Sequence, residues 1–156
     1  MKSVQHILCP VDFSESSNEA LHYALQLSII YKASLHLLHV LPQINYYDWN
    51  TMSMYALISD ETFKKESEAM QSKLDELLQK CQSEHADLSI SASLDDTRSP
   101  ADAILQYATE HKNDLIVMGS HGRKGLDRLL MGSVAESVLR HAHCEVMIIK
   151  KSFKPE

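Results

Sequence analysis

Short apolar runs alternate with helix-like patterns along this chain. Continuous runs at residues 7–11, 35–41, 115–118 and 146–149 predict strands, while residues 88–94 alternate strictly between apolar and polar side chains. A continuous apolar run is typical of a parallel strand covered on both faces, and alternation is typical of a strand with one face in water. The pattern therefore places residues 88–94 at an edge of a mostly parallel sheet.

The segments between these runs carry apolar residues at helical spacing. Ser16 and Glu19 have the spacing of a capping box ahead of one helix, and residues 60–81 form a long amphipathic pattern. A Ser-Pro pair at residues 99–100 suits the N-cap and first turn of a third helix, and residues 133–141 predict the fourth. Each predicted strand except the last therefore leads into a helix.

This alternation predicts an α/β protein with one Rossmann-like, doubly wound parallel sheet of five strands and helices on both faces. At 156 residues, the chain is expected to form a single domain over 1–156. Right-handed crossovers and the edge character of the third strand favour the order 3-2-1-4-5. Ligands bind such sheets at the carboxyl ends of the strands where the order reverses, here at the loops 10–16 and 119–133. Residues 42–59 have no clear period, and a lid, a partner surface and an irregular cover over the sheet remain open for them.

The glycines of the chain are concentrated in one loop. The chain has four, and all of them follow the predicted central strand: Gly119, Gly122, Gly125 and Gly132. Glycine lets a ligand approach the backbone closely, and the helix that Ser133 and Glu136 open with capping-box spacing offers unpaired N–H groups that suit a phosphate. The same stretch holds four cationic or donor side chains: His121, Arg123, Lys124 and Arg128. Together these features predict a phosphate-binding loop, with a tight strand-to-helix turn that requires glycine as the alternative.

The glycine spacing separates this loop from two common phosphate motifs. No Gly-Lys-Ser/Thr closes a Walker pattern, and the G-x-G of the dinucleotide fingerprint is absent. The spacing of Gly119, Gly122, Gly132 and Ser133 instead resembles the ATP motif of the universal stress protein family. Residues 10–14, 39–40 and 114–119 are similar to that family as well, so that the resemblance covers essentially the whole chain.

The resemblance implies that ATP, or AMP or ADP in its place, lies across the point where the strand order reverses, with Mg²⁺ held mainly by the phosphates. The implied binding set is Pro10, Val11, Asp12, Phe13, Val40, Met118, Gly119, His121, Gly122, Arg123, Gly132, Ser133 and Val134. In this set the backbone of the glycine loop and the Ser133 hydroxyl would hold the phosphates. Asp12 would accept hydrogen bonds from the ribose, and Pro10, Val11 and Val40 would line the adenine pocket.

The resemblance also has consequences for partners. Members of this family are typically homodimers, which implies pairing here through the final strand between Val146 and Ile149, and a regulatory protein partner that the sequence does not name. Glu145, at the start of that strand, stands where the family often has proline.

Composition restricts the classes of function. The formal net charge of −6 argues against sequence-independent nucleic-acid binding, which requires an excess of Lys and Arg. No run of eighteen or more apolar residues and no signal-peptide pattern is present, so we expect a cytoplasmic protein without a membrane span.

The three cysteines are predicted to be free thiols that mainly pack in the core. His36 and His39 lie three apart on a strand and point to opposite faces, and no group of residues has metal-ligand spacing.

The sequence offers no catalytic group beside the predicted phosphate site. It has no plausible general base, no P-loop lysine and no dedicated metal carboxylates there, so we expect a nucleotide-dependent regulator in a stress response, with at most slow ATP hydrolysis, rather than an enzyme. The alternatives are an ATPase or adenylyl-transferring enzyme on a related sheet, and an interaction protein that holds no nucleotide.

Overall fold

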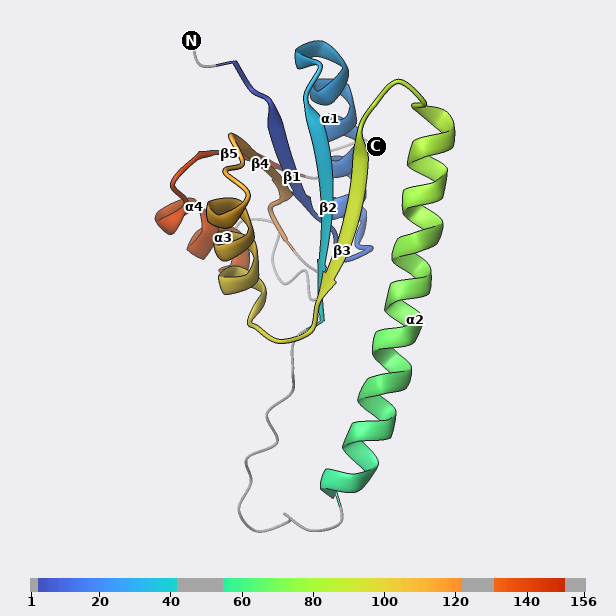
Figure 1. Ribbon diagram of the computed structural model, residues 1–156. Coiled ribbons are helices and arrows are strands. Elements are labelled where there is room, and N and C mark those ends of the chain that lie inside the picture. Colours follow the sequence, from blue (N-terminus) through green and yellow to red (C-terminus); the bar gives the residue numbers. More distant parts are fainter. Residues whose placement is uncertain (1–2, 42–54, 122–130, 151–156) are drawn as a thin grey trace, which may run out of the picture.

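The computed structural model describes residues 3–41, 55–121 and 131–150, with residues 55–60 as backbone only. Strands and helices alternate along these residues (Figure 1). The elements are β1 (His6–Pro10), α1 (Glu15–Tyr31), β2 (Ser34–Val40), α2 (Tyr55–Glu84), β3 (Ile90–Asp95), α3 (Pro100–Glu110), β4 (Leu115–Gly119), α4 (Ser133–His141) and β5 (Glu145–Ile149). Every predicted strand and helix is therefore present.

The strands form one parallel sheet in the order β3-β2-β1-β4-β5. The α/β fold class and the predicted strand order are confirmed, and β3 lies at an edge as its alternating pattern indicated. Because β1 pairs with both β2 and β4, the order reverses beside β1, and the carboxyl ends of β1 and β4 lie next to each other. This edge of the sheet is the position expected for a ligand in a doubly wound fold.

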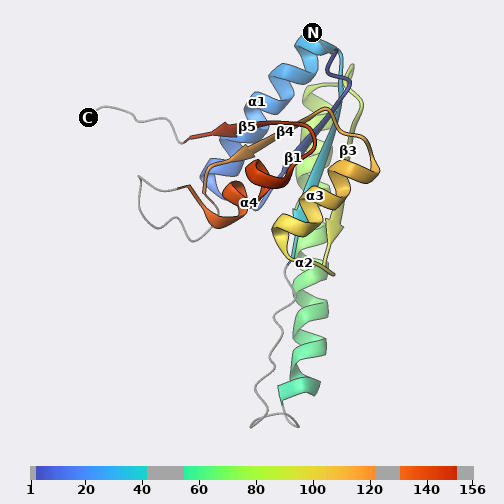
Figure 2. The same cartoon turned by 90° about the vertical axis from the view of Figure 1, so that its left-hand side faces the viewer.

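The helices cover the two faces of the sheet in separate pairs (Figures 1 and 2). On one face α1 and α2 pack over inward-facing strand residues; this core includes Ile7, Leu37, Val117, Ala24 and Leu74. On the other face α3 and α4 pack over the alternate strand residues; this core includes Leu8, Ile116, Met118, Ile104 and Val138. Truncation of such a fully buried aliphatic side chain to alanine costs about 2 to 5 kcal/mol, so these two layers hold the sheet in place.

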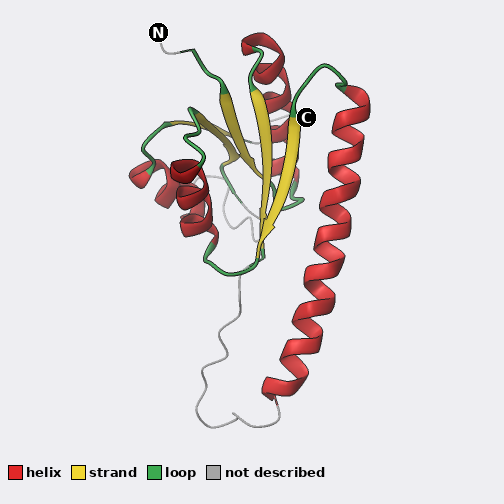
Figure 3. Ribbon diagram, in the orientation of Figure 1, coloured by secondary structure: helices red, strands yellow, loops and turns green. Residues whose placement is uncertain are grey.

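The helix starts differ from the sequence prediction in two places. The N-cap of α1 is Ser14, whose Oγ accepts the Ser17 N–H at 3.2 Å, so the capping box predicted at Ser16 is wrong. Residues 55–59, which the sequence left in the irregular segment 42–59, begin α2, because no Gly or Pro interrupts the chain there. Figure 3 shows that the N-terminal part of this helix extends past the carboxyl ends of β2 and β3, while the rest lies alongside the sheet. The remaining residues of that segment lie outside the described part of the chain.

Two further predictions concern composition. All three cysteines are free, and Cys9 and Cys81 are buried in the core, as predicted, whereas Cys144 is half-buried. Burial raises the pKa of the Cys9 thiol above its ordinary value, so this side chain stays protonated. Over the described residues, no helix combines the length and the apolar character needed to cross a bilayer.

Candidate functional site

The turn that follows β1 is fixed to β2 by a buried histidine. The Val11 N–H donates to the Leu38 carbonyl at 2.9 Å, and His39 Nδ1 lies 2.7 Å from the Val11 carbonyl oxygen. Because a carbonyl can only accept, His39 carries its proton on Nδ1. His39 is 1% exposed. Sequence reasoning had placed His39 on the strand face opposite His36 without assigning it this role, and the signal for it was a histidine inside an apolar strand.

Asp12 braces the turn in which it lies. Its Oδ1 accepts the Ser14 N–H at 3.0 Å, and its own N–H donates to Ser17 Oγ at 3.3 Å. Between these bonds Phe13 adopts a φ of 62°, a left-handed conformation that is costly for a side chain with a Cβ. The Phe13 ring lies 5.0 Å from the His39 ring and has Lys73 Nζ of α2 at 5.1 Å from its centroid. The loop carboxylate is therefore held in a fixed position at the carboxyl end of β1.

Gly119, the last residue of β4, lies against the start of α1. A Cβ at this position would meet Ser16 Oγ and would come within 2.9 Å of the Ser16 carbonyl carbon and oxygen. Neither Gly119 nor Gly132 has a positive φ. The close approach that glycine permits at position 119 is thus made by the backbone of α1, which brings the turn after β1 against the end of β4.

Ser120 ties together the end of β4, the end of β5 and the start of α4. Its N–H donates to the Ile149 carbonyl at 2.9 Å, and its carbonyl accepts the Gly132 N–H at 2.8 Å. Ser120 is 3% exposed, and its hydroxyl oxygen lies 2.8 Å from His121 Nδ1. His121 Nε2 is also buried and has no hydrogen-bond partner among the described residues. Both ends of the glycine loop therefore meet at one buried residue.

Helix α4 begins at this junction without a side-chain cap. Gly132 is the N-cap, Ser133 is the first helical residue, and no side chain of the described residues bonds the N-terminus. The capping box predicted for Ser133 and Glu136 is therefore wrong; the Glu136 carboxylate instead pairs with Arg140 at 2.9 Å. The first-turn N–H groups, at Ser133 and Val134, lie at the positive end of the helix dipole, which suits an anion.

The structure brings most of the predicted site residues to one edge. Pro10 is the last residue of β1, and Val11, Asp12 and Phe13 follow it. Val40 ends β2, Met118 and Gly119 end β4, and His121 lies two residues after β4. Gly132, Ser133 and Val134 open α4. Val11 and Met118 are buried, at 4% and 5% exposed, and Val40 is half-buried. Gly122 and Arg123 lie outside the described residues.

The chain resembles proteins of one family over nearly its whole length. The family model of the universal stress protein family matches residues 3–150. Universal stress protein MJ0531 of Methanocaldococcus jannaschii is 32% identical over 149 residues, which cover 95% of this chain and 83% of that protein. The structure of universal stress protein UspA from Lactobacillus plantarum superposes with a TM-score of 0.78 at 26% identity, covering 96% of this chain and 99% of that one.

A structure of the universal stress protein from Archaeoglobus fulgidus in complex with dAMP has a TM-score of 0.62 at 20% identity, covering 96% of this chain and 100% of that one. At this identity the likeness concerns the fold alone. The profile match and the MJ0531 relationship extend over nearly the whole chain, and the chain therefore belongs to the universal stress protein family.

Proposed function

We propose that this chain binds an adenine nucleotide, ATP in the first place, across the carboxyl ends of β1 and β4. The observation that carries this proposal is the uncapped N-terminus of α4, fixed through Gly132 to Ser120 at the end of β4. The A. fulgidus protein, which has the same fold, was solved in complex with dAMP. A nucleotide at this edge fits both the strand topology and the local donors.

Each part of the nucleotide has a counterpart at this edge. The N–H groups of Ser133 and Val134 and the Ser133 hydroxyl would donate to phosphate oxygens, while the Gly132 N–H is already bonded to Ser120. Asp12 would accept from the ribose, because a carboxylate offers about four acceptor positions and can serve its own turn and a ligand together. Pro10, Val11 and Val40 would contact the adenine, with His121 and the glycine loop around the phosphates.

Mg²⁺ in this proposal is held mainly by the phosphates. Among the described residues, no group of three His, Cys, Asp or Glu side chains is placed to hold a metal ion. The ion would therefore arrive with the nucleotide and reduce the repulsion between the phosphate oxygens, and the protein would contribute amide donors and a helix dipole.

A regulator fits this site better than a fast enzyme. Fast phosphoryl transfer requires a positioned base or water-orienting group and dedicated charge stabilisation. The turn after β1 and the start of α4 instead supply backbone N–H donors and one carboxylate, that of Asp12. We therefore propose a cytoplasmic homodimer, paired through β5, whose surface toward a regulatory protein partner depends on the bound nucleotide. Steady-state turnover of Mg-ATP above about one per second would instead favour the enzyme alternative.

Ser133→Pro tests whether the Ser133 N–H group contributes to nucleotide binding. Proline is well tolerated at the first position of a helix, and Gly132 before it already has an extended ψ of 151°, so the substitution removes the N–H and the hydroxyl while the helix is kept. Ser133→Ala is the matched control, since it removes only the hydroxyl.

Calorimetric titration should give an ATP affinity at least tenfold weaker for Ser133→Pro than for Ser133→Ala, because a donor to a charged oxygen is lost. Adenosine, which has no phosphate, should bind all three proteins alike. Equal ATP affinity for the proline and alanine variants would remove the helix N-terminus from the site, and a wild-type protein without ATP affinity would end the proposal.

A further inference from the structure

Strand β1 leaves the sheet earlier than its neighbour β2. The register of β1 with β2 ends at Pro10 and Leu38, and the Val11 N–H then donates to the Leu38 carbonyl at 2.9 Å. β2 continues beside β3 for two more residues, as far as Val40. The turn after β1 therefore begins next to the last two residues of β2.

His39 connects the two strands at this point. Its Nδ1–H donates to the Val11 carbonyl at 2.7 Å, and both residues are buried, at 1% and 4% exposed. A hydrogen bond shielded from water is stronger than an exposed one, and a buried carbonyl that loses its donor is costly. An apolar side chain at position 39 would remove this donor from the Val11 carbonyl.

The bond from His39 acts on the peptide unit that joins Val11 to Asp12. The carbonyl of this unit accepts from His39, and its N–H donates to Ser17 Oγ of α1 at 3.3 Å. Because a peptide unit is planar, bonds on its two sides together fix its orientation. That orientation determines the position of the Asp12 Cα and the direction in which the carboxylate leaves the backbone.

His39 also contacts the residue on the other side of Asp12. The Phe13 ring lies 5.0 Å from the His39 ring, at an interplanar angle of 48°. The φ of Phe13, 62°, is unfavourable for a residue with a Cβ, so surrounding contacts must hold this conformation. One buried histidine therefore supports both neighbours of the proposed ribose acceptor.

We propose that His39 is a positioning residue for nucleotide binding, a role that rests on the proposed function. It acts through the Val11 carbonyl and the Phe13 ring, which together hold Asp12 in the orientation that accepts the ribose hydroxyls. Without the His39 donor the turn occupies other conformations as well. The apparent affinity for the nucleotide then falls in proportion to the fraction of molecules that keep the competent turn.

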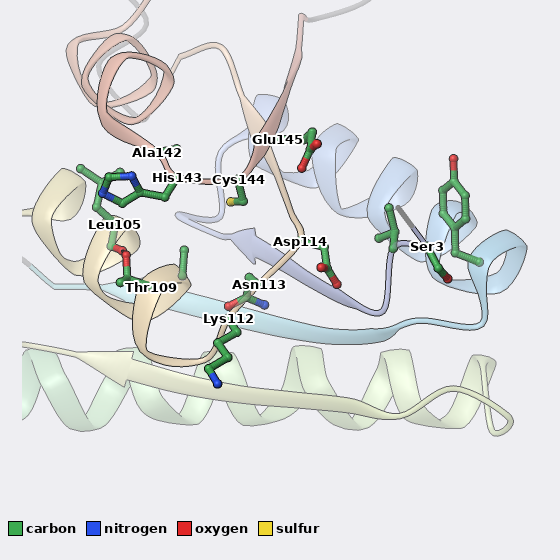
Figure 4. A pocket seen from close by; sticks show the side chains of 13 residues that line it. Ser3, Leu105, Thr109, Lys112, Asn113, Asp114, Ala142, His143, Cys144 and Glu145 are labelled. Carbon is green, nitrogen blue, oxygen red and sulfur yellow. The ribbon is translucent and has the colours of Figure 1, made fainter. Parts of the chain in front are cut away.

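The opposite end of β1 offers a matched control. There Asp114 Oδ2 accepts the N–H groups of Gln5 and His6 at 2.8 and 2.9 Å. Figure 4 shows Asp114 among the residues that line a pocket at the amino ends of the strands. Asp114→Ala removes two bonds at the start of β1 and should lower the melting temperature, while the turn at the carboxyl end keeps its contacts.

Calorimetric titration with ATP and with adenosine, below the melting temperature of every variant, measures the role of His39. His39→Leu should bind both ligands about tenfold more weakly than the wild-type protein, and by the same factor, because the phosphate contacts are unchanged. His39→Asn carries an amide N–H donor on Cγ, where the imidazole carries Nδ1, and should keep both affinities within about threefold. Asp114→Ala should bind both ligands as the wild type does.

Three results would overturn the proposal and leave the proposed function standing. The first is a His39→Leu variant that melts at a lower temperature but binds both ligands as the wild type does, which is the behaviour of a merely structural residue. The second is an affinity that falls in Asp114→Ala as far as in His39→Leu. The third needs no variant: nitrogen NMR of the wild-type protein should show the His39 proton on Nδ1, and a proton on Nε2 would leave the Val11 carbonyl without its donor. A wild-type protein that binds neither ligand would instead end the proposed function, and the role of His39 with it.

Discussion

His36 lies where acid should weaken the fold. Its Nδ1 and Nε2 each lie 2.8 Å from a serine hydroxyl of β3, those of Ser91 and Ser93. Its ring stacks on Tyr107 of α3 with centroids 4.4 Å apart, and Tyr107 stacks in turn on His111 at 3.8 Å. Burial, and secondly the charge of His111, lower the pKa of His36 from its usual 6.5 to about 4.

The direction of the pH effect follows from this lowered pKa. Between pH 6.5 and about 4, His36 is protonated in the unfolded chain but stays neutral in the folded chain. The contribution to the free energy of unfolding is therefore complete above pH 6.5 and is lost as the pH falls to about 4. A shift of this size corresponds to at most about 3.4 kcal/mol at 1.36 kcal/mol per pH unit. Because the ring is only half-buried, solvent screening reduces the expected loss to about 1 to 2 kcal/mol.

Urea denaturation at pH 7.0 and pH 4.5 measures this loss. We expect the free energy of unfolding of His36→Gln, whose amide can still bond the two serines, to fall less between these pH values than that of the wild-type protein. The difference should be about 1 kcal/mol or more. His22→Gln, at an exposed position on α1, is the control and should fall as the wild type does. If His36→Gln and the wild type lose the same free energy, the protonation of His36 does not limit the acid stability of the fold.

Three further predictions concern other described contacts. Gly119→Ala should lower the free energy of unfolding by about 1 to 3 kcal/mol in thermal or urea melts, because its Cβ would overlap the Ser16 backbone. Ser14→Ala should lower the free energy of unfolding by about 1 kcal/mol, because α1 loses its cap. The buried hydroxyl of Ser16 has no partner among the described residues, so Ser16→Ala should leave the stability unchanged or raise it. A larger loss of stability in Ser16→Ala than in Ser14→Ala would contradict the assignment of Ser14 as the cap. Met147 is exposed on the edge strand β5, and Met147→Lys should reduce the mass measured by light scattering from that of a dimer to that of a monomer. Leu139→Lys, at an exposed position on α4, should leave the mass unchanged. A wild-type protein that is monomeric would refute the proposed pairing through β5.

The hydrophobic pattern was sufficient to predict the order of the elements and of the strands. The continuous apolar run of residues 115–118 identified a central strand, and the alternation at residues 88–94 identified an edge, since each pattern reports how many faces a strand buries. The Ser99 cap was also predictable: its Oγ accepts the Asp102 N–H at 3.3 Å, with Pro100 in the first turn. These signals are local, and each element carries its own.

The N-terminal caps of α1 and α4 depend on tertiary structure and were predicted wrongly, although α4 begins at Ser133 as expected. The cap of α1 is Ser14 rather than a residue at position 16, and the preceding Phe13 has a positive φ. Nothing in the residue type of Phe13 predicts this backbone conformation. At α4 the N-cap is Gly132, whose N–H bonds the Ser120 carbonyl, and the side-chain cap predicted for Ser133 is absent. The sequence predicted that the candidate residues would meet at the edge between β1 and β4, and most of them do lie there. The buried bonds of His39 and Ser120 could not be derived, because their partners lie far away in the sequence.

Ser120 makes two hydrogen bonds that point in different directions along the chain, one to the last residue of β5 and one to the residue before α4. The end of β5 and the start of α4 are thus both bonded to the backbone of a single residue, Ser120. Only one residue, Ser120, separates the N-cap of α4 from Ile149 along this path of hydrogen bonds. A substitution that disturbs the backbone of Ser120 would therefore affect both the start of α4 and the end of β5.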